Sequence, residues 1–301
     1  MRFGINTTAF NSTPAWVTKD EGFFAKYGID AEITPIPGGE TIVAALVAGE
    51  IPLTILASTA LVNATLGGAD LAFFGCFDDK LRFWLYSRPE ITSVRDLRGK
   101  QVAITGRAGI IRRATELALE RNGLAPDQDV TYIATGNMPN SYQALVAGNV
   151  DAATLSPPSI FQANDAGFRM LADTGDYDYK TVISGIAGSR GWVARNEDLT
   201  RRALQALAEG VAFAHQNKER TKQIAGKYMQ TDDAELLERS YTTLAPAWER
   251  TLYVPPDALR SDLESVAQEN PAARNARPEQ FFDNRFVDEL ERAGFFQQLY
   301  R

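Results

Sequence analysis

The sequence predicts an α/β protein of two lobes, in which each lobe is a mostly parallel sheet flanked by helices. Three observations support this fold class: strand and helix patterns alternate along the chain, one segment recurs later in the sequence, and 301 residues suffice for about two domains. Strands that alternate with helices form parallel sheets with right-handed crossovers. We therefore expect two lobes of the same design.

The recurring segment is the most informative feature of the chain. ALVAGEIPLTIL at residues 45–56 reappears as ALVAGNVDAATL at residues 144–155, a shift of 99 residues. The same shift pairs FGIN at residues 3–6 with VAIT at 102–105, and DAEITPIPGG at 30–39 with DVTYIATGNM at 129–138. Three strand-like segments that fall in register without a gap indicate a structural duplication.

Each copy is expected to run strand, helix, strand, helix, strand. In the first copy we expect these elements at residues 3–6, 14–27, 31–36, 41–48 and 53–56. In the second copy we expect them at residues 101–105, 110–121, 130–134, 141–147 and 152–155. The first helix is indicated by the helical spacing of Trp16, Val17, Phe23 and Phe24, and Gly28 is a suitable stop.

The remaining third of the chain is predicted to be mainly helical. Residues 181–196 are strand-like, and long helical patterns follow at residues 199–216, 233–244 and 278–293. The second copy alone is too small to pack against so large a helical tail, so we expect the tail to pack on the first lobe. The first lobe would then comprise residues 1–87 and 189–301, the second residues 88–188, and two crossovers would form a hinge. The alternative is two sequential domains followed by a helical third.

Composition excludes several classes of function. The chain has 31 basic and 38 acidic side chains, a net charge of -7, which disfavours general nucleic-acid binding. A single cysteine excludes internal disulfides and Cys-x-x-Cys redox chemistry, and a single histidine argues against most histidine metal sites and Ser-His-Asp hydrolysis. Phosphate-binding and dinucleotide-binding glycine motifs are missing from the sequence. We expect no cofactor, no metal and no catalytic residues.

The sequence carries neither a leader pattern nor a convincing membrane span. The first ten residues lack a basic region followed by an apolar one. The uncharged stretch at residues 51–69 contains proline and glycine, so it predicts a buried strand and helix instead of a span. We expect either a cytosolic protein or one whose leader has been removed.

Candidate binding residues follow the strands. Ligands of open α/β sheets bind beyond the carboxyl ends of the strands, and the loops expected there are rich in Gly, Ser, Thr and Asn. At helix starts these residues expose N–H donors that suit a small anion. We predict a ligand-binding set of Thr8, Asn11, Thr13, Gly39, Ser58, Thr59, Arg107, Asn137, Ser156 and Arg190. The alternative is that the hydroxyl residues only cap helices.

The arginines and the rarer side chains need separate interpretation. Arg107 precedes a predicted helix and offers a planar fork for a carboxylate or sulfonate, whereas at most one of Arg112 and Arg113 can face the ligand. Arg190 is expected beside the second crossover. We expect Cys76 to be a small buried hydrophobe, His215 to be structural, and Asp78 and Asp79 to form a surface turn.

Several motifs carry a family resemblance. AWVTKDEGFFAKYGIDAEITPIPGG at residues 15–39, DLRGKQVAITGRAG at 96–109 and ALVAGNVDAATLSPPS at 144–159 resemble nitrate/sulfonate/taurine-type solute-binding proteins of ABC importers. That family includes binders of thiamin-pyrimidine precursors. The resemblance spans about residues 2–200. It implies a type II periplasmic-binding-protein fold, a ligand enclosed by hinge closure, a membrane permease as partner, and a monomer that is periplasmic or lipid-anchored.

The chain departs from the family pattern at the loops. Pro52 stands where the family often has Asp, although Asp151 keeps that residue in the second copy, and Ser156 precedes Pro157 and Pro158. With Arg107 in the second lobe, these departures favour an organic anion of the carboxylate or sulfonate class. The alternatives are a neutral or pyrimidine ligand, an enzyme on the same fold such as an aromatic-acid decarboxylase, and a ligand-sensing domain.

Overall fold

The computed structural model describes residues 1–106, 109–268 and 270–301. The chain forms two compact units, of which the first is made of two segments, Met1–Lys80 and Lys180–Arg301, and the second of Leu81–Tyr179. The chain therefore passes from the first unit to the second between residues 80 and 81, and returns between residues 179 and 180.

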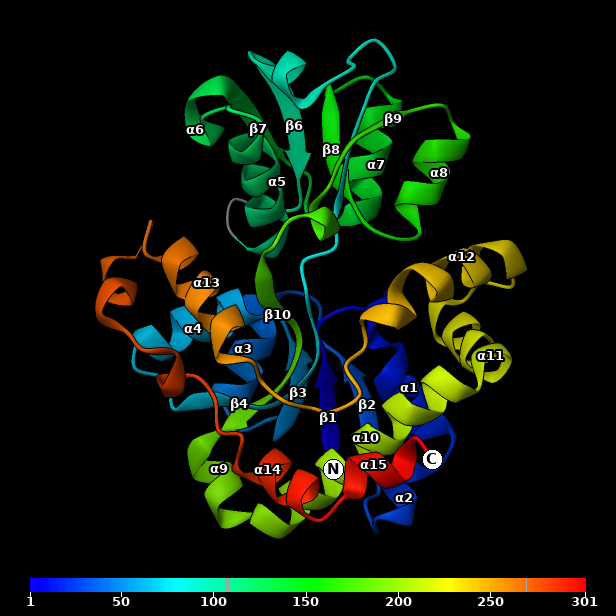
Figure 1. The fold of residues 1–301 in the computed structure, drawn as a ribbon, viewed down its shortest axis with the longest axis vertical. Helices are drawn as coiled ribbons and strands as arrows, with labels where there is room; N and C mark the ends of the chain where they lie inside the picture. Colours follow the sequence, from blue (N-terminus) through cyan, green and yellow to red (C-terminus); the bar gives the residue numbers. More distant parts are fainter. Residues whose placement is uncertain (107–108, 269) are drawn as a thin grey trace. The chain divides into compact units, whose positions relative to one another are not determined.

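The sheet of the first unit has five strands in the order β2-β1-β3-β10-β4 (Figure 1). Their bounds are β1 Arg2–Ile5, β2 Glu32–Pro35, β3 Leu53–Leu56, β4 Leu71–Lys80 and β10 Lys180–Ser189. Strand β1 pairs in parallel with β2 and β3, whereas β10 is antiparallel to both of its neighbours. It follows that β4 points in the same direction as β1, β2 and β3.

Helices cover both faces of this sheet, and two buried apolar clusters lie between them and the strands. One cluster joins the sheet to α1, α10, α11 and α14, and includes Trp16, Phe74 and Phe286. The other joins it to α3, α4 and α13. The helices are η1 Phe10–Ser12, α1 Thr13–Asp20, α2 Phe23–Lys26, α3 Gly39–Val47, α4 Ser58–Leu66, α9 Arg190–Arg195, α10 Glu197–Gln216, α11 Lys218–Met229, α12 Ala234–Leu244, η4 Ala245–Ala247, α13 Pro256–Val266, η5 Pro271–Asn275, η6 Pro278–Gln280, α14 Arg285–Arg292 and α15 Phe295–Leu299.

The sheet of the second unit has the order β7-β6-β8-β5-β9 (Figure 1). Strand β6 is parallel to β7 and β8, and β5 is antiparallel to β8 and β9. Helix α5 packs on the sheet through an apolar cluster with β5 and β6, whereas α7 contacts β6 and β8, and α8 contacts β5 and β9. The bounds are β5 Trp84–Ser87, η2 Val94–Leu97, β6 Lys100–Ile104, α5 Ile110–Arg121, α6 Pro126–Asp129, β7 Val130–Ala134, α7 Met138–Val146, β8 Ala152–Leu155, α8 Ser159–Asp165, β9 Arg169–Asp173 and η3 Thr174–Asp176.

The sequence repeat is a structural repeat with the same pairing register. The shift of 99 residues carries α3 at 39–47 onto α7 at 138–146, and β3 at 53–56 onto β8 at 152–155. In the first sheet Phe3 pairs with Leu53, and in the second Val102 pairs with Ala152, which are the same positions after the shift. The two copies therefore place their strand ends and helix starts in the same way.

Two segments differ from the sequence prediction. Strand β5 pairs with β8 and β9 in the second sheet, whereas residues 84–87 were assigned to the first lobe. Strand β10 pairs with β3 and β4, whereas residues 180–188 were assigned to the second. Both segments are antiparallel strands next to a crossover, and an apolar strand pattern does not reveal which of two sheets completes its hydrogen bonds. In the tail, residues 278–293 form a short 3-10 turn and α14 instead of one helix.

Candidate functional site

Two helices begin beside each other at the carboxyl edge of the first sheet. Helix α3 follows β2, α4 follows β3, and neither start is capped by a side-chain hydrogen bond in the described part of the chain. A β-carbon built on Gly39 would lie only 2.9 Å from the Cβ of Ala60, so the first turns of the two helices are in close contact. Backbone N–H groups of the first helical turn lack intrahelical acceptors, which leaves donors at this edge.

The predicted ligand-binding residues of the first unit differ in their exposure to solvent. Thr8 is exposed, and Asn11, Gly39 and Thr59 are half-buried at the same edge. Thr8 lies in the loop after β1, Asn11 lies in the short 3-10 helix η1 that follows, and Thr59 lies in the first turn of α4. These four residues therefore follow the carboxyl ends of three parallel strands, and that they contact a ligand stays a prediction.

Thr13 and Ser58 lie inside the unit, and their side chains cannot contact a ligand in this structure. Both are 0% exposed. The Thr13 hydroxyl donates to the carbonyl of Phe10 over 2.6 Å, and the Ser58 hydroxyl lies 3.3 Å from that of Thr181. The expectation of direct contact is corrected here, because polar side chains at helix starts are as well suited to internal hydrogen bonds as to a ligand.

In the second unit the predicted residues follow β7 and β8. The Asn137 side chain accepts a hydrogen bond from the Asn140 backbone over 2.9 Å, so it caps α7. Ser156 is half-buried between β8 and α8. Arg107 lies outside the described residues, between β6 and α5. The α5 start, preceded by Gly109 at φ 102°, has no side-chain cap among the residues that are described.

Arg112 and Arg113 are both held within the second unit. Arg112 donates to Glu116 over 2.7 Å and to Asp127 over 2.8 Å, and its guanidinium lies 5.1 Å from the ring centre of Tyr132. Arg113 pairs with Glu120 over 3.1 Å. These partners neutralise both guanidinium groups, so neither serves as a free anion-binding group in this arrangement.

The structure places Arg190 at the opposite edge of the first sheet from the loops that are predicted to bind a ligand. Its backbone N–H donates to the carbonyl of Asp70, just before β4, and its side chain donates to the carbonyl of Gln280 over 2.7 Å. Because β10 is antiparallel to β3 and β4, its end lies where those strands begin. The expected position beside the second crossover is therefore corrected: the crossover is at the start of β10.

The sequence reasoning missed a buried acidic pair at the end of β4. Asp78 and Asp79 are each only 4% exposed, instead of forming a surface turn. Asp79 Oδ2 lies 3.6 Å from Lys180 Nζ, and its Oδ1 is buried without a hydrogen-bond partner among the described residues. The uninterrupted apolar run that starts at residue 71 could have indicated this burial, because the strand it forms continues through both aspartates.

The crossover itself is marked by two lysines. Lys80 ends β4, Lys180 begins β10, and the two are paired across the strands. Lys80 Nζ lies 3.3 Å from Glu249, so each lysine has its own acidic partner in the first unit. Like charges opposite each other destabilise a strand pair, and these acids offset that repulsion.

The single cysteine and the single histidine lie inside the first unit. Cys76 is completely buried and its thiol contacts the carbonyl of Asp78, as expected for a small buried residue, and burial raises the pKa of its thiol. His215 Nε2 lies 3.0 Å from the carbonyl of Trp248, and burial lowers the pKa of its imidazole. Burial therefore disfavours the nucleophilic thiolate of Cys76 and the imidazolium form of His215.

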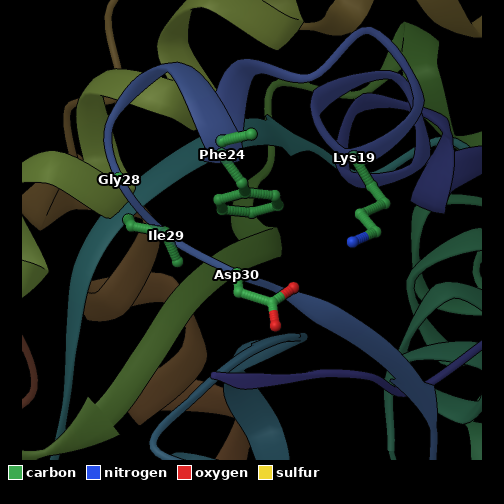
Figure 2. Close-up of a pocket in the computed structure, with 6 residues that line it drawn as sticks. Lys19, Phe24, Gly28, Ile29 and Asp30 are labelled. Carbon is green, nitrogen blue, oxygen red and sulfur yellow. The ribbon is translucent and has the colours of Figure 1, made fainter.

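A cavity within the first unit lies away from the predicted edge of the sheet. One cavity of about 330 Å³ in the first unit is lined by Lys19, Phe24, Ala25, Gly28, Ile29 and Asp30 (Figure 2). It lies before β2, at the edge where the parallel strands begin. The described residues contain no group of three or more side chains that could hold a metal ion. In the same residues, no helix is long and apolar enough to cross a membrane.

Comparison with known proteins identifies the class and then the family. The fold is that of periplasmic binding proteins: the aliphatic sulphonate-binding protein SsuA of Escherichia coli superposes with a TM-score of 0.76 at 21% identity, covering 100% of this chain and 98% of SsuA. The family model described as NMT1/THI5 like matches residues 9–221. The chain belongs to this NMT1/THI5-like family.

Two further proteins, one similar in sequence and one similar in fold, differ in the kind of function that their names state. A Brucella abortus protein named in general terms as a binding protein is 25% identical over 242 residues, which cover 78% of this chain and 73% of the relative. The desulfurization enzyme DszB superposes with a TM-score of 0.70 at 15% identity, covering 97% of this chain and 99% of DszB. The fold therefore hosts both binding proteins and an enzyme.

Proposed function

We propose that this protein is the solute-binding component of an ABC importer, and that it captures a small organic anion between its two lobes by hinge closure. The proposal is supported by the family, by the fold shared with a sulphonate-binding protein, and by a relative named as a binding protein. A hinge of two crossovers suits such closure, in which the ligand favours the closed state through contacts with both lobes.

One observation carries the ligand class: α3 and α4 begin in contact with each other, and neither start is capped by a side chain in the described chain. Two converging helix starts attract negative charge and offer N–H donors. Thr8, Asn11 and Thr59 add side-chain donors at the same edge. This set suits a carboxylate or sulfonate group, because its oxygens accept several hydrogen bonds at once.

The second lobe would complete the site with Arg107, Asn137 and Ser156. Arg107 would supply a planar pair of donors to the anion, and Asn137 would act mainly by fixing the start of α7. Thr13 and Ser58 would position their helices from within the first unit, and Arg190 is left out of the proposed site.

The enzyme alternative has one observation in its favour, namely that DszB shares the fold. A covalent or acid–base mechanism would need a reactive group at the strand ends. Cys76 is buried against Asp78, and His215 lies on α10 against Trp248. Their positions favour the binding function over catalysis.

Calorimetry with a panel of sulfonates, carboxylates and pyrimidines tests the proposal. We expect micromolar or tighter binding of at least one anion, and Arg107→Ala should weaken it by about 1.5–3 kcal/mol if the guanidinium bonds to the ligand. The exposed Arg274 offers a matched control, since Arg274→Ala removes the same charge far along the chain. Binding of none of the panel would refute the transport function, and an unchanged affinity of Arg107→Ala would remove Arg107 from the site.

The partner and location follow from the same proposal. The loaded protein would be a monomer, periplasmic or lipid-anchored, and would deliver its ligand to a membrane permease. Cell fractionation and light scattering test these points, and a cytosolic protein or a stable dimer would contradict them.

A further inference from the structure

Three buried polar side chains form a continuous chain of hydrogen bonds inside the first unit. Ser58 is the first residue of α4, Thr181 is the second residue of β10, and Asp262 lies on α13. The hydroxyl of Thr181 donates to Asp262 Oδ1 over 2.6 Å and lies 3.3 Å from the hydroxyl of Ser58. Ser58 and Thr181 are 0% exposed and Asp262 is 4% exposed. The chain of bonds thus ties three separate segments together.

The direction of these bonds is fixed by the number of protons. A hydroxyl has one proton, and that of Thr181 is donated to the carboxylate of Asp262. The Ser58 hydroxyl must therefore donate to Thr181, which places Thr181 as the link between the start of α4 and the carboxylate. Leu259 and Leu263, on either side of Asp262 along α13, belong to the apolar core, so the bonds lie where an unmade hydrogen bond is costly.

The position of this link suggests what it does. Thr181 follows Lys180, the residue at which the chain returns from the second unit. At its other end, this chain of hydrogen bonds reaches the first turn of α4, where Thr59 and the uncapped N–H groups lie. In the second copy, the helix that follows the equivalent strand β8 is α8, and it also begins at a buried serine, Ser159.

We propose that Thr181 is a positioning residue that couples the second crossover to the start of α4, with Asp262 as the fixed anchor. A movement of the crossover is then passed to the first turn of α4, and the state of that turn is passed back to the hinge. This proposal rests on the proposed function in one respect only, namely that the start of α4 is a ligand-binding element.

Hydrogen exchange on the ligand-free protein tests the coupling. Thr181→Val keeps the shape of the side chain and removes the hydroxyl. We expect exchange about tenfold faster at two places together, the Val62 and Asn63 amides that close the first turn of α4 and the Val182 amide of β10. Thr181→Ser, which restores a hydroxyl, should return all three to wild-type rates.

A matched control separates coupling from general loss of stability. Thr200 is also 0% exposed, but its hydroxyl donates to the carbonyl of Asn196, the N-cap of its own helix α10, 3.0 Å away. Thr200→Val should leave the α4 and β10 amides unchanged. Faster exchange throughout the unit in Thr181→Val, or faster exchange at β10 with α4 unchanged, would overturn the proposal.

A binding experiment distinguishes this proposal from the proposed function. Titration of wild type and Thr181→Val with ethanesulfonate should show affinity reduced about tenfold in the variant and restored in Thr181→Ser. Equal affinity in all three proteins would overturn the coupling. If wild type binds neither ethanesulfonate nor any other anion of the panel, the proposed function fails, while the exchange result decides the coupling by itself.

Discussion

The contact between the first turns of α3 and α4 makes Gly39→Ala an informative perturbation. The added methyl carbon would lie 2.9 Å from the Cβ of Ala60, whereas two carbons at their optimal separation are at least about 3.5 Å apart. The helices must therefore separate by about 0.6 Å. Such overpacking costs about 1–3 kcal/mol, and the gain from restricting the unfolded chain is about 0.4–1 kcal/mol. We expect a net loss of about 1–2 kcal/mol in the free energy of unfolding.

Urea unfolding followed by tryptophan fluorescence measures this loss. Of the four tryptophans, Trp16, Trp192 and Trp248 lie in the first unit, so the signal reports mainly on it. The reciprocal change Ala60→Gly removes the opposing methyl, and by itself should cost about 1 kcal/mol because glycine disfavours a helix.

The double variant gives the decisive comparison. With the methyl group moved from one helix to the other, the clash is relieved, so Gly39→Ala with Ala60→Gly should be at least about 1 kcal/mol more stable than the sum of the single variants. Additivity within about 0.5 kcal/mol would refute the reasoning. The double variant should also recover any ligand affinity that Gly39→Ala loses through displaced helix starts.

Three further predictions concern the interior of the first unit. Gly210→Ala should destabilise it by about 1–3 kcal/mol in urea, since the added carbon would lie 2.0 Å from the Thr18 hydroxyl, and Thr18→Ala in the same chain should rescue most of the loss. Burial lowers the pKa of His215, so the folded state favours the neutral ring. The contribution of this ring to the free energy of unfolding is therefore complete above about pH 6.5, and it is lost as the pH drops toward and through the folded pKa. The variant His215→Gln should abolish this part of the pH dependence. The NMR titration of the single histidine should show a midpoint below about 6.5, and a higher midpoint would contradict the prediction. Cys76 should resist a thiol reagent in the native protein and react fully in urea, and rapid native labelling would contradict its burial.

The repeat made the fold predictable. Because the same shift relates strands, helices and pairing register in both units, the elements of one copy predict those of the other to within a residue or two. The antiparallel strands β5 and β10 lie outside both copies, and an apolar pattern carries no information about strand direction. The prediction for Arg190 failed for this reason, since its place depends on the direction of β10.

The candidate site was only partly predictable. The loops rich in Gly, Ser and Thr do follow the parallel strands, because that placement is a property of the topology. Which hydroxyls turn inward depends on partners far away in sequence, such as Thr181 for Ser58. Asp78 and Asp79 were misplaced because charged residues are seldom buried, and their lysine and backbone partners cannot be read from sequence spacing.

The order of strands in the first sheet has a consequence for biosynthesis. Strand β4 is joined to the sheet through β10, which lies a hundred residues later in the chain. A ribosome that has released residues 1–80 has therefore made a long apolar strand, Leu71–Lys80, with no neighbour to pair with. The strands of the second sheet all lie within residues 84–173, so that unit can fold first while the earlier segment waits. The first unit, whose N-terminal segment is made first, is thus completed last. Its unpaired strand β4 is where a chaperone would be needed most.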